Sequence, residues 1–510
     1  MSVSFNSVKP KSHSCTHCIS FNKNTFYHSS TVEYRDMDRE ATESTHLTKR
    51  QEETSSNEAS TDKVRVDDAM ELVGCGFGTI LFCSGCYVFS IIAGAEVAVM
   101  SIVGPIIVCQ WGLNNIWLSV LLTTSLATHA ISSLFLSHLG DRFGRKRIIF
   151  VAAFLMFAFA LLSGFTRNLW ELLLCRGIQG IATGMGDGPA AAYAAEISTM
   201  RFRALGLAVQ GVGWGIGTAF ATGIAFFTVP AFGWRGLLIT IALICFPSLV
   251  LLFFMPNSVR FDVRKGNIES AEQTLKTLSR LNCKTISGIE LAEEDVADEA
   301  VGIGSMIERY RLLKERGKII DFWNVVGVAI GLNVAYTSIL FAAPYYLNSK
   351  KVNSNSCTMD DDILFDLGVV GLADPIACII GVFAVEFIGR RPTFLSSACF
   401  SLIFLTPLYF HTGSTFTTIN LTLLRGLLAV SSWSSNVLGA EYFPTSVRSF
   451  TSSVVGFCFS LSSIIAGFLV PYSYFVTSKL TTFLLQFMCF VGTVFLWFLK
   501  RETKGIQLEQ

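Results

Sequence analysis

The sequence predicts an all-α membrane protein with twelve transmembrane helices in two pseudo-symmetric six-helix bundles. Its 510 residues are 51% hydrophobic and only 15% charged, with a mean hydropathy of +0.52, whereas about a quarter of the residues in soluble proteins are charged. The charges fall in short intervals that leave apolar runs of about 20 residues, the length that crosses a bilayer. Charged motifs also recur at one fixed separation between the two halves of the chain.

The predicted spans run from Gly78 to Leu499. Their approximate ranges are 78–104, 115–139, 147–165, 170–194, 204–228, 235–255, 323–347, 364–388, 393–411, 417–439, 449–471 and 480–499. The uncharged run 393–424 is too long for one crossing at about 1.5 Å per residue, so we divide it near Gly413. The run 204–255 is divided in the same way between Pro230 and Arg235.

Five regions follow from these spans. They are a disordered cytoplasmic tail at 1–66, an N-terminal six-helix bundle at 67–255, a cytoplasmic central loop with short amphipathic helices at 256–322, a C-terminal six-helix bundle at 323–499 and a cytoplasmic tail at 500–510. The first tail is polar and lacks the apolar core of a secretory signal. In the central loop, Asn267 is expected to cap a helix whose apolar face carries Ala271, Leu275 and Leu278.

Lysine and arginine in the short loops predict the orientation. Nine of these residues lie on the side of the central loop and five lie on the other side, and positive residues concentrate on the cytoplasmic side of a membrane. Both termini are therefore predicted to be cytoplasmic. The expected location is the plasma membrane or an intracellular vesicle membrane, between which the sequence does not choose.

Charge and reactive residues exclude several function classes. A formal net charge of +1 gives no basic footprint for nucleic acid. Most of the 14 cysteines lie inside apolar runs, where thiols behave as small hydrophobes, so their number indicates neither a disulfide framework nor a redox compartment. No nucleophile–base set, metal cluster or phosphate loop emerges. We therefore predict no enzyme activity, no cofactor and no metal.

An internal repeat is the most specific signal in the sequence. The motif Asp141–Lys146 follows the second span, and Glu386–Arg391 follows the eighth, at a separation of 245 residues. The segments Glu196–Arg203 and Glu441–Arg448, after the fourth and tenth spans, have the same separation. Matching charged motifs in equivalent loops indicate a duplicated six-helix unit.

With these motifs, the chain resembles the major facilitator superfamily, and within it the branch of synaptic vesicle glycoproteins and organic-ion transporters. Asp67–Ala69, Arg176–Gly180 and Met255–Arg260 also carry the resemblance, which covers about residues 65–500. Asn257 and Val259 depart from the family's usual motif after the sixth span. The resemblance implies that one six-helix half rocks against the other around a central site.

Acidic and basic residues at the cytoplasmic helix ends are candidates for a gate that closes when they pair. The alternative is that these charges only set the orientation, and we favour the gate for the repeated sets. The predicted gate residues are Asp141, Arg142, Gly144, Arg145, Glu196, Arg203, Glu386, Gly389, Arg390, Glu441 and Arg448.

Ionisable residues within spans mark the predicted solute pathway, because burying them in a membrane is costly. Glu96 lies in the first span, and a protonatable acid there could couple transport to a proton gradient. The alternative is that Glu96 or Asp187 pairs permanently with Arg176 or His129. The predicted pathway residues are Glu96, His129, Asp187, Trp214, Tyr336, Asp374, Trp433 and Asn436.

Two tryptophans add a candidate for ligand contact. Trp214 in the fifth span and Trp433 in the tenth are placed similarly to an aromatic pair that faces the central cavity of synaptic vesicle glycoproteins. An indole face suits an organic cation or an apolar ligand. Val437 stands where some family members have a carboxylate.

The sequence thus predicts a secondary active or facilitative transporter of a small organic solute, including organic ions as candidates, that works by alternating access. Its expected partners are the solute, a coupling proton and the lipid bilayer. The alternative is a non-transporting vesicle-membrane regulator or ligand-binding protein of the synaptic vesicle glycoprotein type. Accumulation of a solute inside liposomes distinguishes the two.

Overall fold

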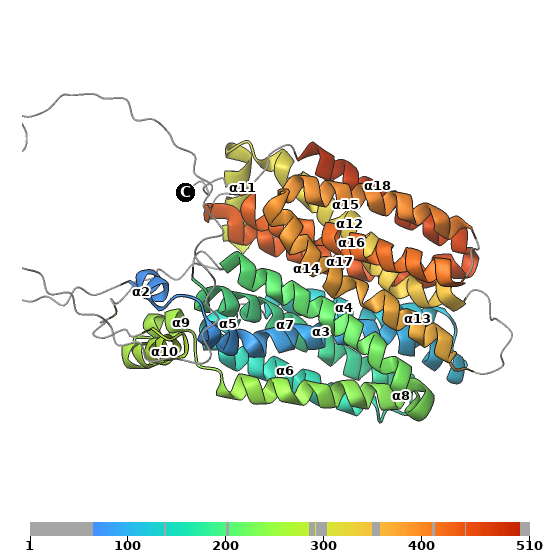
Figure 1. Cartoon of the computed structure of the whole chain (residues 1–510), viewed down its shortest axis with the longest axis horizontal. Helices are drawn as coiled ribbons and strands as arrows, with labels where there is room; N and C mark the ends of the chain where they lie inside the picture. Colours follow the sequence, from blue (N-terminus) through green and yellow to red (C-terminus); the bar gives the residue numbers. More distant parts are fainter. Residues whose placement is uncertain are drawn as a thin grey trace, which may run out of the picture.

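The computed structural model describes residues 65–136, 139–199, 203–284, 291, 303–348, 357–410, 414–443 and 445–499. Within these ranges the chain is almost entirely helical, and the long helices run side by side along one direction (Figure 1). The tails before residue 65 and after residue 499 lie outside the described residues.

The N-terminal half, which we call the N half, contains α3 (Phe77–Gln110), α4 (Ile116–Phe135), α5 (Leu139–Phe143), α6 (Arg145–Ser163), α7 (Leu169–Ile197) and α8 (Arg203–Phe254). α8 consists of two helical stretches that reverse direction at Gly233, whose φ of 66° suits glycine. This break falls between Pro230 and Arg235, where the sequence predicts the end of one span and the start of the next.

The C-terminal half, or C half, contains α12 (Ile319–Asn348), α13 (Asp361–Gly371), α14 (Ala373–Phe387), α15 (Arg390–Leu405), the 3-10 turn η2 (Thr406–Tyr409), α16 (Ser414–Glu441), α17 (Thr445–Val476) and α18 (Ser478–Phe498). The predicted eighth span is divided into α13 and α14 at Leu372. Asp374 therefore lies in the first turn of a new helix.

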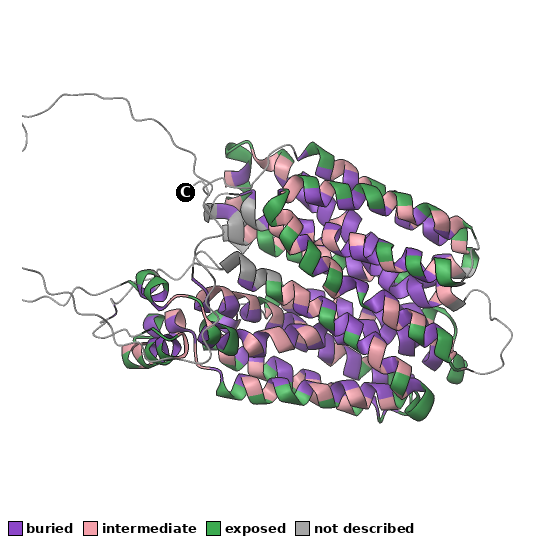
Figure 2. Cartoon of the chain, in the orientation of Figure 1, coloured by how far each residue is buried: buried purple, intermediate pink, exposed green. Residues whose placement is uncertain are grey.

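Nine segments of the described chain are long and apolar enough to cross a membrane, and the one within α8 contains two crossings because of the break at Gly233. α7 and α16 complete the two sets of six, although glycine, serine and charged residues dilute their hydropathy. Large apolar side chains such as Phe227, Phe254 and Phe387 are exposed. Exposed positions run along the outward sides of the helices (Figure 2). In a membrane, this apolar surface contacts lipid acyl chains instead of water.

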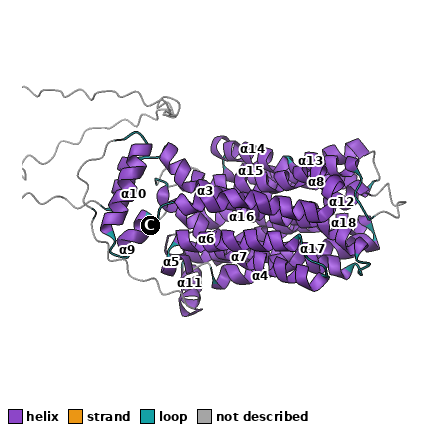
Figure 3. Cartoon of the chain, turned by 90° about the horizontal axis from the view of Figure 1, so that it is seen from below, coloured by secondary structure: helices purple, strands orange, loops and turns teal. Residues whose placement is uncertain are grey.

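Short helices of the central region lie beyond one end of the bundle (Figure 3). They are α9 (Val259–Arg264) and α10 (Ile268–Leu281), with α2 (Val66–Val73) nearby, whereas α11 (Ile303–Glu315) lies at the same end beside the C half (Figure 1). We call this the loop-helix end, and the end that carries Gly233 the far end. The side chain of Asn267 makes no capping hydrogen bond, so the predicted cap is wrong in its bonding although Asn267 does precede α10.

α10 is attached to the N half by its apolar face and by its C-terminal end. Ala271, Leu275 and Leu278 are buried, as the predicted face requires. The Asn282 side chain donates to Gly74 O at 2.9 Å and accepts the backbone N–H of Gly78 at 2.9 Å. These contacts join α10 to the start of α3.

Candidate functional site

A small cavity of about 30 Å³ lies between the two halves and is lined by α3, α4, α8, α12 and α17. Its polar lining residues are His129, Trp214, Tyr336, Thr337, Ser460 and Ser463, and its apolar ones are Val97, Leu126, Leu340 and Phe459. Cavities that bind small ligands combine apolar walls with a few placed polar groups in this way. The cavity thus brings together three predicted pathway residues, His129, Trp214 and Tyr336.

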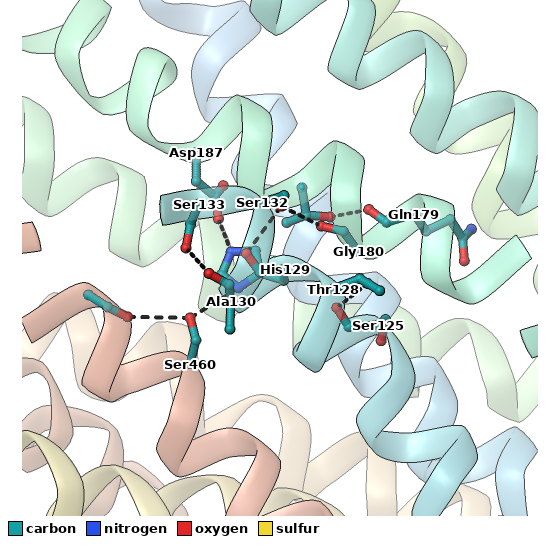
Figure 4. Close-up of polar contacts among 12 residues, drawn as sticks. Ser125, Thr128, His129, Ala130, Ser132, Ser133, Gln179, Gly180, Asp187 and Ser460 are labelled. Carbon is teal, nitrogen blue, oxygen red and sulfur yellow. Dashed lines mark hydrogen bonds and ion pairs between the residues drawn. The ribbon is translucent and has the colours of Figure 1, made fainter. Parts of the chain in front are cut away.

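His129 connects the two halves beside this cavity. Its Nε2 lies 3.1 Å from Asp187 Oδ2 on α7, and its Nδ1 lies 3.2 Å from Ser460 Oγ on α17 of the C half (Figure 4). The His129 and Asp187 side chains are 20% and 32% exposed. The sequence left open whether Asp187 pairs with His129 or lines the pathway. The pair is present in this conformation, and both side chains are partly exposed.

Glu96 forms a buried ion pair with Arg176. One Arg176 nitrogen contacts Glu96 Oε2, and the other donates to the Glu96 backbone carbonyl at 2.8 Å. The Arg176 and Glu96 side chains are 1% and 7% exposed. Pairing offsets the high cost of placing either charge in a low-dielectric interior. The residue next in sequence, Val97, lines the cavity, whereas Glu96 is turned into the N half.

Asp374 accepts hydrogen bonds from three helices. Arg425 donates to both carboxylate oxygens, at 3.0 and 2.7 Å, and the Tyr336 hydroxyl donates at 3.1 Å. The Thr218 hydroxyl on α8 of the N half lies 2.8 Å from Asp374 Oδ2. It also lies 2.9 Å from the backbone carbonyl oxygen of Gly215 in the same helix. The carboxylate is the stronger acceptor of the two. Asp374 thus joins the halves as well as the helices of the C half.

The two contacts across the halves occupy repeated positions. His129 and Asp374 are 245 residues apart, the separation of the loop motifs. Gly215 and Ser460 have the same separation, and Gly215 packs on Asp374 and Pro375 as Ser460 contacts His129. We call these contacts the α4–α17 seam and the α8–α14 seam. Equivalent positions of the two repeats therefore both form contacts between the halves, but with different side chains.

The predicted tryptophan pair is only partly at the cavity. Trp214 lines it, and its buried Nε1 has no hydrogen-bond partner among the described residues. Trp433 instead packs its ring on Gly211 of α8, where an added Cβ would lie 1.6 Å from the ring. Asn436 is exposed and does not line the cavity.

Three predicted gate residues pair at the loop-helix end. Arg145 contacts Asp141 at 3.0 Å and Glu196 at 2.9 Å, and Ser258 donates to Glu196. All of these groups belong to the N half or the segment directly after it, so they join its loops to one another. Gly144 adopts a φ of 98°, which favours glycine, and faces the ring of Phe261.

The remaining gate residues are distributed unevenly. Arg142 is exposed and its guanidinium lies 5.5 Å from the Phe143 ring centre. Gly389 repeats the positive φ of Gly144, at 111°, and Glu386 is exposed beside it, while Arg390 is half-buried at the start of α15. The side chains of Arg203, Glu441 and Arg448 lie outside the described residues.

Sequence reasoning missed one covalent contact. Cys109 in the last turn of α3 forms a disulfide with Cys357, which lies between α12 and α13. Neither residue lies in a motif, and their separation of 248 residues gives no local signal. Within the described residues no group of three or more His, Cys, Asp or Glu side chains could hold a metal ion.

Comparisons with known proteins agree with this architecture. The family model described as "Sugar (and other) transporter" matches residues 19–510. The chain is 26% identical over 465 residues to the Synaptic vesicle 2-related protein of Rattus norvegicus, covering 88% of this chain and 83% of that protein. The corresponding protein of Xenopus laevis is 24% identical over 483 residues, with the same coverage.

A solved structure shows the same fold. The partially occluded inward open conformation of the xylose transporter XylE from E. coli has a TM-score of 0.64 and 18% identity, and the match covers 84% of this chain and 99% of that one. The match shows that this chain and the xylose transporter share one fold. The chain therefore belongs to the sugar (and other) transporter family, within the major facilitator superfamily.

Proposed function

We propose that the cavity between the halves binds a small organic solute and that rocking of the halves exposes this cavity to each side of the membrane in turn. Membership in the family makes the chain a multi-pass membrane transporter of a small solute and not an enzyme. The observation that carries the proposal is that both halves line one cavity, with Trp214 from the N half and Tyr336 from the C half.

The chemistry of the lining selects the solute. Trp214 Nε1 is the polar group of the wall that lacks a partner, whereas Tyr336 already donates to Asp374. A buried donor left unpaired costs about 1–3 kcal/mol, so a solute that offers an acceptor to Trp214 regains this energy. Leu126, Leu340 and Phe459 add apolar contact. We infer a solute with a hydrogen-bond acceptor and an apolar face.

Opening the cavity requires the contacts between the halves to separate. The α4–α17 and α8–α14 seams each contain one hydrogen-bonded contact across the halves, His129 to Ser460 and Thr218 to Asp374. Trp433 on Gly211 adds a close contact on the same interface. The paired Arg145 and Glu196 belong to the proposed cytoplasmic gate, where they keep the N half's loops together during the movement.

A coupling proton belongs to this proposal. Glu96 is paired with Arg176 and nearly closed off from solvent, whereas Asp187 is 32% exposed beside His129. Protonating Glu96 would remove the charge that Arg176 balances, so this step would change the packing of the N half. If transport is coupled through Glu96, a pH gradient accelerates uptake by the wild type and not by Glu96→Gln.

The loop-helix end is proposed to be cytoplasmic, with both termini on that side. Two observations support this orientation: the excess of lysine and arginine in its loops, and the disulfide at the far end, since disulfides persist on the lumenal or extracellular side of cellular membranes. The similarity to synaptic vesicle 2-related proteins favours a vesicle membrane as the location.

The test is uptake of radiolabelled neutral and charged metabolites into liposomes that contain the full chain, in the presence of reduced glutathione and with and without a pH gradient. Wild-type protein is expected to accumulate one solute class, and Trp214→Phe, which keeps a ring but removes the donor, is expected to lose about tenfold in apparent affinity for it. Binding without accumulation of any solute would instead support the non-transporting alternative.

A further inference from the structure

The Cys109–Cys357 disulfide joins the two halves that must separate in alternating access. Cys109 belongs to α3 of the N half, and Cys357 lies four residues before α13 of the C half. Their Cα atoms are 5.5 Å apart. α3 ends and α13 begins at the far end of the bundle (Figure 1), so the bond lies at that end. The bond therefore connects the two halves across the interface that would have to separate for the cavity to open at the far end.

On the N-half side, the bond is attached to a fixed point. Gln110, the neighbour of Cys109, accepts the indole N–H of Trp234 at 2.9 Å. The ring of Trp111 meets Trp234 edge to face, with ring centres 5.8 Å apart. Trp234 is buried at the start of the second stretch of α8. Cys109 thus moves with α8 as well as with α3.

On the C-half side, little free chain separates the bond from α13. The Asp360 carbonyl accepts the backbone N–H groups of Ile363 at 3.1 Å and Leu364 at 3.2 Å, so Asp360 is already part of the helix start. Met359 packs against the main apolar core. The path from Cys357 to Asp360 covers three residue steps, which reach at most about 10 Å when fully extended.

The two halves also pack closely along α8 and α13, between the disulfide and the Thr218–Asp374 contact. Thr222 of α8 lies against Gly371 of α13, where an added Cβ would come 2.1 Å from the Thr222 hydroxyl. The rings of Phe226 and Phe365, also from α8 and α13, meet with their centres 5.9 Å apart. The far end is therefore closed by non-covalent packing, and the disulfide holds that closed arrangement.

We propose that the Cys109–Cys357 disulfide is a redox-sensitive clamp that keeps the far end closed. With the bond intact, the cavity opens only toward the loop-helix end, and reduction permits the far end to open and the transport cycle to run. Two small thiols supply the two electrons: the S–S bond breaks, each cysteine takes one proton, and the two thiols become a disulfide. This regulation rests on the rocking movement in the proposed function.

Hydrogen exchange measures the clamp without any solute. The full chain in lipid nanodiscs, where both faces are accessible, is compared before and after reduction with glutathione. We expect amide exchange in the facing parts of α8 and α13, around Thr222 and Gly371, to become about tenfold faster on reduction. Exchange around Arg145 and Glu196, at the other end, is expected to stay unchanged.

Two variants make the result specific. The double variant Cys109→Ser/Cys357→Ser is expected to exchange at the fast rate with or without glutathione. Cys399→Ser, which removes an exposed thiol outside the disulfide, is expected to respond like the wild type.

Two outcomes would overturn the clamp. One is unchanged exchange at α8 and α13 although peptide mapping shows the bond broken, and the other is mapping that finds both thiols free in untreated protein. Failure of every metabolite in the uptake screen with glutathione present would instead count against the proposed function, because the bond is then broken and the exchange experiment contains no solute.

Discussion

The two halves of the molecule bury an arginine at equivalent places but use it differently. Arg176 and Arg425 lie in the fourth and tenth spans, and both side chains are 1% exposed. Arg176 pairs with Glu96, which lies on α3 of the same half. Arg425 pairs with Asp374, which also accepts a hydrogen bond from Thr218 of the other half.

This difference separates stability from conformational change. An ion pair contained in one half keeps all its partners when the halves rock, so it contributes to the fold in every state. Asp374 keeps Arg425 and Tyr336 during rocking but loses Thr218 if the α8–α14 seam opens. Its environment therefore depends on the conformational state, whereas the environment of Glu96 does not depend on this seam.

The largest expected effect comes from removing either arginine. Arg176→Met and Arg425→Met each leave a buried carboxylate without its cation, and breaking a buried pair costs about 3–5 kcal/mol. We expect both variants to lose most of the folded, monodisperse protein, measured by fluorescence-detected size exclusion and by the midpoint of thermal unfolding. Equal losses fit the shared burial of the two arginines.

Removing the carboxylate charge together with the cation is the control for this prediction. Asp374→Asn/Arg425→Met and Glu96→Gln/Arg176→Met are expected to regain much of the lost stability, because no unpaired charge remains. A double variant as unstable as the single one would show that shape, and not charge, sets the effect at that pair.

A smaller effect is expected from Thr218→Val, which keeps the shape but removes the hydroxyl that reaches Asp374. Hydrogen bonds to charged groups contribute about 1.5–3 kcal/mol, and here the loss applies only to the state with a closed α8–α14 seam. Hydrogen exchange in α14 should therefore become faster. Thr228→Val, whose hydroxyl donates within α8 to Ile224 O, should leave α14 exchange unchanged.

His129 offers the corresponding experiment on the α4–α17 seam. His129→Leu removes the contacts to both Asp187 and Ser460 and leaves a partly exposed carboxylate, so we expect a loss of about 1 kcal/mol. Asp187→Asn/His129→Leu should be more stable than the single variant. Thermal unfolding at one pH compares the three proteins, and an unchanged midpoint for His129→Leu would contradict a stabilising seam.

The smallest expected effect belongs to Ser460→Ala. The serine hydroxyl lies 3.3 Å from Gly456 O within its own helix as well as 3.2 Å from His129, so its removal costs only about 0.5 kcal/mol. We expect no measurable change in thermal unfolding and a small increase in amide exchange in α4. A loss as large as that of His129→Leu would place most of the seam's energy on Ser460.

The spans, the break near Gly233 and the duplication could be predicted because apolar runs and repeated charged motifs are visible in the sequence itself. Partner choice could not. Whether Glu96 meets Arg176, and whether Asp374 meets Arg425, depends on how each helix is rotated about its axis, and apolar membrane helices carry little amphipathic signal for this rotation. The contact of Trp433 with Gly211 depends on the same rotation.

The Cys109–Cys357 bond was beyond sequence reasoning for a related reason. Cysteines in apolar runs usually pack as small hydrophobes, as buried Cys83 and Cys86 do. What distinguishes Cys109 is its place at the end of a helix next to a loop from the other half, and this is set by tertiary packing alone.

The attachment of α10 by Asn282 has a consequence for how the molecule could be controlled from outside. Because Asn282 hydrogen-bonds the segment that leads into α3, α10 moves together with the N half. A regulatory protein that binds α10, or a kinase that modifies it, would act directly on the N half and only indirectly on the C half.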